Sequence, residues 1–207
     1  QPVTTQEMIT GMKNAGFDTL RIPVAWTNAM DYESGDYTIR EDYLNRVEEI
    51  INYALNENMY VVINDHWDGS WWGMFGSASE ETRQKAWDLY TSMWTQIAER
   101  YKEYSDYLIF ESANEELGNR LNDTDVAADS GALSADECYE MTLKINQKFV
   151  DIVRGTGGNN KSRFLLIAGY NTDVDMTTDD RYIMPTDPAN EVNKLILSVH
   201  YYTPWGY

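Results

Sequence analysis

The sequence predicts an α/β fold in which strands and helices alternate along the chain. Short apolar runs begin near residues 17, 59, 107, 163 and 194, and amphipathic helical patterns separate most of them. Such alternation is typical of a parallel sheet built from repeated strand and helix units. Polar and aromatic residues follow several of the runs, at the strand ends where α/β proteins carry their chemistry. We therefore expect one α/β domain in these 207 residues.

Four helices are predicted, over residues 4–16, 42–58, 79–101 and 134–153. Each has apolar residues at helical spacing on one face. Thr4 with Glu7, and Ser134 with Glu137, have the spacing of capping boxes, so they mark the starts of the first and fourth helices. Gly16 is expected to end the first helix.

Five strands are predicted, over residues 17–23, 59–64, 107–110, 163–168 and 194–201. The last contains Leu195, Ile196, Leu197 and Val199, and this continuous apolar run predicts burial on both faces. No Gly-rich phosphate loop follows the first strand, which favours a closed barrel over an open nucleotide-binding sheet. Since a (β/α)8 TIM barrel takes about 250 residues, the chain is expected to run from its first helix to its sixth strand.

The charge balance excludes several classes of partner. The chain has 34 acidic and 16 basic residues, for a net charge of −18. This argues against nucleic acid and anionic membranes as partners, because these are bound through clustered Lys and Arg.

The longest apolar stretches, residues 60–63 and 164–168, fall far short of the roughly 18 residues that a membrane span needs. The lone Cys138 allows no disulfide framework.

Glu115 is the leading catalytic candidate. It follows a predicted strand beside Asn114, whose amide could hydrogen-bond a substrate hydroxyl. An aromatic cleft could raise the pKa of a Glu until it acts as a general acid near neutral pH. We expect Glu111, deeper in the strand, to support Arg21 or another donor in a structural role, and we expect Glu116 to be solvated.

Arg21, His66 and His200 lie at other strand ends and are candidates for the same cleft. The fixed charge of Arg21 could keep a catalytic carboxylate ionised, and the alternative is a plain salt bridge at the edge of the core. Asp65 and Asp68 flank His66, so a metal site remains an alternative, although no HxH or HExxH spacing is present.

Five tryptophans follow strands, namely Trp26, Trp67, Trp71, Trp72 and Trp205, whereas Trp87 and Trp94 fit the buried stripe of a helix. Flat aromatic faces in a cleft stack on pyranose rings, which predicts a sugar polymer as substrate. The alternative is packing of these loop tryptophans against one another, above all Trp71 and Trp72.

Four segments at successive strand ends carry a family resemblance. They are Arg21-Ile22-Pro23-Val24, Ile63-Asn64-Asp65-His66-Trp67-Asp68-Gly69, Phe110-Glu111 to Asn114-Glu115, and His200-Tyr201-Tyr202. With them the chain resembles the bacterial endo-β-1,4-glucanases of glycoside hydrolase family 5 over essentially its whole length. The resemblance implies that residues 1–207 belong to a secreted catalytic (β/α)8 domain that hydrolyses β-glucan with retention and needs no cofactor or metal.

The resemblance also implies residue roles. Glu115 would be the acid/base, and Asn114 would bind the sugar 2-hydroxyl at the cleaved bond. Arg21 and Tyr202 would orient the nucleophile, while His66 and His200 would line the cleft. One departure is that Trp67 follows His66, where relatives often have a second His.

The nucleophilic Glu expected after the seventh strand has no candidate in this chain. Retention requires two carboxyl groups about 5 to 5.5 Å apart, so we expect the remainder of the barrel as a partner. Two alternatives stay open, a non-catalytic carbohydrate-binding barrel and a metal-dependent barrel hydrolase.

Overall fold

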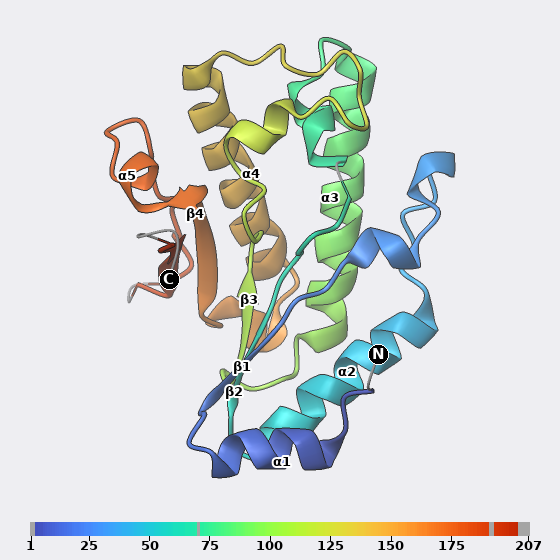
Figure 1. The fold of residues 1–207 in the computed structure, drawn as a ribbon, viewed down its shortest axis with the longest axis vertical. Coiled ribbons are helices and arrows are strands. Elements are labelled where there is room, and N and C mark those ends of the chain that lie inside the picture. The colour runs from blue at the N-terminus through green and yellow to red at the C-terminus, as the bar shows by residue number, and fades with distance from the viewer. Residues whose placement is uncertain (1–2, 70, 191–192, 203–207) are drawn as a thin grey trace.

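The structure, a computed structural model, describes residues 3–69, 71–190 and 193–202. The strands in these residues form one five-stranded parallel sheet (Figure 1). Its strands are β1 (Thr19–Ile22), β2 (Tyr60–Ile63), β3 (Leu108–Glu111), β4 (Leu165–Asp173) and β5 (Leu195–His200). Each strand pairs with the next one along the chain, as consecutive strands of a barrel do. The predicted α/β class is confirmed.

The four predicted helices are confirmed, with ends within a few residues of those expected. They are α1 (Gln6–Asn14), α2 (Glu41–Asn56), α3 (Glu80–Tyr101) and α4 (Ala135–Gly155), and a short α5 (Val174–Thr177) follows β4. Ser134 and Glu137 form the capping box of α4 as predicted. At α1 the cap is Thr5, which accepts a hydrogen bond from the Met8 amide, and not the predicted Thr4. Within the described chain, no helix is long and apolar enough to span a membrane.

The core lies between the helices and the sheet. Figure 1 shows α3 and α4 side by side, and Trp94 of α3 packs edge-on against Phe149 of α4 with ring centroids 4.6 Å apart. Trp94 also contacts Phe110 of β3. The buried tryptophan thus joins both helices to the strand that leads to Glu115.

Arg163, just before β4, is a fully buried cation in this core. Its guanidinium donates to the carbonyl oxygens of residues 101, 104, 105 and 108 and to Asn160 Oδ1, at 2.6 to 3.0 Å. It also lies over the Phe110 ring, 4.8 Å from the centroid. Burial lowers the pKa of Arg163 to about 10. The side chain therefore holds the C-terminal end of α3 and the turn into β3 in place.

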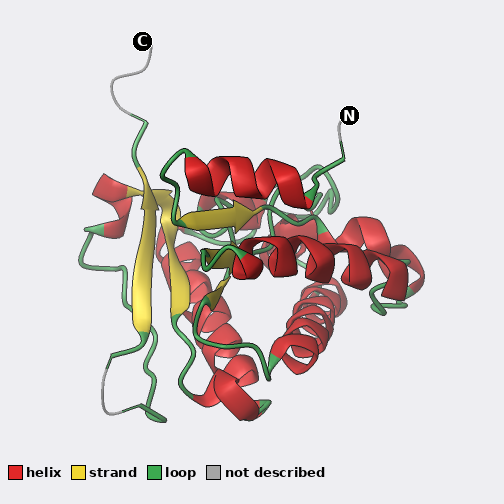
Figure 2. Cartoon of the chain, turned by 90° about the horizontal axis from the view of Figure 1, so that it is seen from below, coloured by secondary structure: helices red, strands yellow, loops and turns green. Residues whose placement is uncertain are grey.

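The prediction that the last strand is buried on both faces is wrong for the described chain. Ile196, Leu197 and Val199 are each just over 40% exposed. Within the described residues β5 pairs only with β4, so its other edge and part of its faces lack neighbours. Figure 2 shows β4 and β5 side by side at one edge of the molecule.

Candidate active site

Glu115 lies four residues beyond the end of β3 with a quarter of its side chain exposed. Its Oε1 is 2.6 Å from Nδ1 of His200 and also accepts a hydrogen bond from the Tyr202 hydroxyl. Burial would raise the pKa of Glu115, but the hydrogen bonds from His200 and Tyr202, together with charge interactions with His200 and Arg120, outweigh it, and the net shift is downward. The expected upward shift is therefore wrong for the described chain, because two donors stabilise the carboxylate.

Arg21 connects three of the other predicted residues. Its Nε donates to Glu111 Oε2 at 2.7 Å and its Nη2 donates to Asn114 Oδ1 at 2.9 Å. Its Nη1 lies 3.5 Å from Nδ1 of His66. Glu111 is buried and also accepts from Asn64 and Ser198. The prediction that Glu111 supports Arg21 is confirmed, whereas neither Asn64 nor Ser198 was predicted to take part.

His66 is half-buried and its pKa is lowered, mainly by burial and then by the positive charge of Arg21. It is therefore neutral at pH 7, with one ring nitrogen able to donate and the other able to accept. Its backbone amide donates to the Val24 carbonyl at 3.0 Å, which joins the loops after β1 and β2.

A cleft of about 190 Å³ opens beside Glu115, His200 and Tyr202. Its other wall is residues 171–175, which the sequence did not indicate. β4 was predicted to end at Ala168, but it resumes after a break in register and reaches Asp173. Asn171 and Thr172 take left-handed backbone angles, with φ of 51° and 48°. Asn tolerates this conformation, so Asn171 was the available signal for a turn at this point.

Three of the predicted sugar-binding tryptophans belong to the core, which corrects their assignment. Trp26 is fully buried and its Nε1 donates to the Asn64 carbonyl. Trp71 and Trp72 stack on each other with centroids 4.4 Å apart, and both are buried. Additional segments could only increase this burial. Trp67 is 74% exposed and remains a candidate, while Trp205 lies outside the described residues.

Glu116 is buried, with only 2% of its surface exposed, so the prediction that it is solvated is wrong. Its Oε1 accepts a hydrogen bond from the Trp67 amide at 3.3 Å. Its Oε2 has no hydrogen-bond partner among the described residues. Burial raises the pKa of Glu116 to about 7, although backbone amides and the charge of Arg120 oppose the shift. The loop backbone turns Glu115 toward the cleft and Glu116 into the protein.

Asp65 and Asp68, the candidates for a metal site, are both buried. Burial raises the pKa of Asp65 well above its usual range, and the negative charge of Asp68 adds to the shift. Asp68 accepts hydrogen bonds from the backbone amide and hydroxyl of Thr27 at 2.6 to 2.9 Å. In the described ranges, no three His, Cys, Asp or Glu side chains are placed to hold a metal ion.

The raised pKa of Glu116 predicts a stability change with pH. Its usual pKa is 4.5, so the contribution of Glu116 to the free energy of unfolding should be greatest below that pH and fall as the pH rises to 7, by up to about 3 kcal/mol. Glu116→Gln should remove this part of the fall, although Asp65 adds a decline of its own. Urea unfolding between pH 4.5 and 8 would measure the difference between the two proteins.

Glu115→Gln is the matched control because the pKa of Glu115 is lowered. The wild-type carboxylate then contributes stability above pH 4.5 that is lost as the pH falls. A difference between wild type and Glu116→Gln that does not change with pH would contradict the assignment of Glu116.

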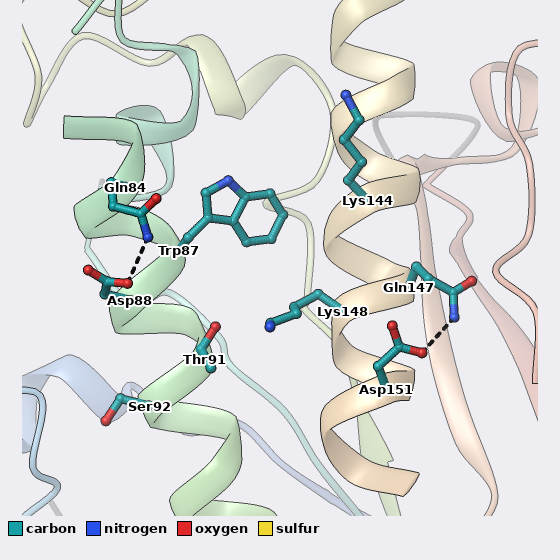
Figure 3. Close-up of a pocket in the computed structure, with 9 residues that line it drawn as sticks. All are labelled: Gln84, Trp87, Asp88, Thr91, Ser92, Lys144, Gln147, Lys148 and Asp151. Atoms are coloured by element: carbon teal, nitrogen blue, oxygen red, sulfur yellow. Dashed lines mark hydrogen bonds between the residues drawn. The ribbon is translucent and has the colours of Figure 1, made fainter. Parts of the chain in front are cut away.

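A larger cavity, of about 750 Å³, lies between α3 and α4. Figure 3 shows Trp87 of α3 and Lys148 of α4 extending into it from opposite sides. The side-chain amides that line this cavity are hydrogen-bonded to carboxylates on the same helix: Gln84 donates to Asp88, and Gln147 donates to Asp151. The cavity lies among helices and not at the strand ends, so it is separate from the Glu115 cleft.

The strand order and the polar side chains gathered at the carboxyl ends of β1, β2, β3 and β5 define part of a (β/α)8 barrel of the enzyme type. The model of the family described as cellulase (glycosyl hydrolase family 5) matches residues 1–207. The chain belongs to this family, and the resemblance found in the sequence is confirmed.

Curated relatives and solved structures agree with this membership. Endoglucanase A of Paenibacillus barcinonensis is 38% identical over 220 residues, covering 100% of this chain and 51% of the relative. Endoglucanase B of Clostridium cellulovorans is 38% identical over 206 residues, covering 99% and 43%. A family 5 lichenase from Caldicellulosiruptor sp. F32 superposes with a TM-score of 0.81 at 37% identity, covering 98% of this chain and 52% of that one. The chain spans about half the length of the relatives it matches.

Proposed function

We propose that residues 1–207 supply the acid/base half of a retaining endo-β-1,4-glucanase. The observation that carries this proposal is the Glu115 carboxyl, which lies in a cleft at the strand ends with hydrogen bonds from His200 and Tyr202. Membership of the cellulase family and the endoglucanase names of the relatives support β-glucan as the substrate. We further propose that the protein is secreted, since a polymeric glucan is hydrolysed outside the cell.

In the proposed reaction Glu115 protonates the glycosidic oxygen while a second carboxylate forms the glycosyl-enzyme. Glu115, now ionised, then removes a proton from water, which attacks the same carbon and releases the sugar with retention. The second carboxylate belongs to the remainder of the barrel. At about 5 Å from Glu115, it would raise the pKa of Glu115 through repulsion of like charges, opposing the effect of His200 and Tyr202.

Arg21 serves this reaction by positioning. It holds the Asn114 amide through Nη2, and Asn114 would bind the sugar 2-hydroxyl beside Glu115. Arg21 also lies beside His66, and the neutral His66 ring would hydrogen-bond another hydroxyl of the sugar. Tyr202 donates to Glu115 here, and we propose that it also orients the nucleophile.

Hydrolysis by a catalytic domain that completes the barrel tests the proposal. Carboxymethylcellulose, mixed-linkage β-glucan and xyloglucan should release reducing sugar, and proton NMR should show the β-anomer first. First appearance of the α-anomer would overturn the retaining mechanism. Oligosaccharide binding without any cleavage would favour a carbohydrate-binding protein instead, and activity lost on chelation would favour the metal-dependent alternative.

A further inference from the structure

Trp67 has an unusual conformation for a large side chain. Its backbone φ is 53°, in the left-handed region that non-glycine residues seldom adopt. It is also the only exposed tryptophan in the part of the chain that the structure describes. Neither feature stabilises the folded chain, so contacts elsewhere must hold the residue in place.

Both neighbours of Trp67 are anchored to the loop after β1. The His66 amide donates to Val24, and the Asp68 carboxylate accepts from the amide and hydroxyl of Thr27. The Trp67 amide itself is bonded to Glu116, on the loop after β3. Glu116 therefore joins the Trp67 loop directly to the backbone that carries Glu115.

Holding Trp67 through Glu116 costs folding free energy. Its carboxyl is buried, and Oε2 has no hydrogen-bond partner among the described residues. A buried polar atom without a partner costs about 1 to 3 kcal/mol. The hydrogen bond from the Trp67 amide joins this buried carboxyl to the loop after β2.

We propose that Glu116 is a positioning residue that fixes Trp67 as a sugar-stacking face and so determines how tightly a β-glucan chain binds beside Glu115. The inference rests on the proposed function. Glu116 acts through Trp67 and has no role in proton transfer. Its influence is therefore on substrate binding, and the chemical step is left unchanged.

Kinetics on soluble β-glucan in the completed catalytic domain test the proposal. Glu116→Met keeps the volume but removes the acceptor, and it should raise KM about fivefold with kcat changed less than about twofold. Glu116→Gln keeps an oxygen acceptor, so its KM should stay near that of wild type. Trp67→Ala should raise KM by a similar or larger factor, and adding Glu116→Met to it should have no further effect.

The outcomes separate this inference from the proposed function. A wild-type domain that neither binds nor cleaves β-glucan would overturn both, whereas an active wild type whose KM is unchanged in Glu116→Met would overturn the inference alone. The inference would also be overturned if Glu116→Met raised KM by the same factor in wild type and in Trp67→Ala. If Glu116→Met does not fold, hydrogen exchange of the wild-type Trp67 amide decides: protection supports the anchor, and fast exchange overturns it.

Discussion

Glu115→Gln is expected to lower kcat/KM on unactivated β-glucans about a thousandfold in a catalytic domain that completes the barrel. The amide keeps the size of the carboxyl and its hydrogen-bond contacts with His200 and Tyr202, but it cannot deliver a proton to the leaving oxygen. Aryl glycosides with acidic leaving groups need little protonation, so formation of the glycosyl-enzyme from them should be much less affected. Burst kinetics with such a substrate would separate the two steps.

Glu140→Gln is the matched control, because Glu140 is an exposed acid on α4 that pairs with Lys144 and does not line the Glu115 cleft. It should have the activity of wild type. A loss below tenfold in Glu115→Gln, or an equal loss on activated and unactivated substrates, would contradict Glu115 as the acid/base.

Arg163→Met should lower the free energy of unfolding by about 3 to 5 kcal/mol. The substitution removes the donors that pair with four carbonyls and Asn160 Oδ1, and three of those acceptors, on Tyr101, Leu108 and Asn160, stay buried. It also removes the cation over the Phe110 ring. Urea denaturation at pH 7 would measure the loss.

Arg181→Met is the control for loss of an exposed cation, which like Arg163 lies over an aromatic ring, that of Tyr139. Arg181 is an exposed cation paired with Asp136 and Asp179, so its removal should lower the free energy of unfolding much less than Arg163→Met does. Equal effects of the two substitutions would show that Arg163 contributes by charge and not by its buried hydrogen bonds.

The helices and strands could be predicted because their signals are local. Apolar spacing and capping residues determine a helix within its own sequence, as at Ser134 and Glu137. The extension of β4 to Asp173 could not be predicted, because it depends on a turn at Asn171 held by the distant Leu117 carbonyl. The exposure of β5 depends on which strands pair with it, and its own residues do not determine that.

At the site, the sequence predicted the residues that meet and missed the direction of some side chains. Arg21, Asn114 and His66 form one cluster, and Glu115, His200 and Tyr202 form another, as their positions at strand ends suggested. A loop tryptophan can point into a cleft or into the core, and Trp26, Trp71 and Trp72 point into the core.

The same limitation applies to Glu115 and Glu116, which are adjacent acids with identical side chains. The conformation of the loop backbone determines which carboxyl is exposed to solvent, and the identity of the two residues does not indicate it. The lowered pKa of Glu115 likewise depends on donors 85 and 87 positions away in the sequence.

Among the described residues one edge of β5 is unpaired, which has a consequence for behaviour in solution while no further strand covers that edge. Unpaired strand edges with apolar side chains such as Ile196 and Val199 can template the addition of a strand from another copy. The net charge of −18 opposes such self-association through mutual repulsion of the copies. Acid neutralises carboxylates and salt screens them, so colloidal stability should decline under both conditions as long as that edge is uncovered.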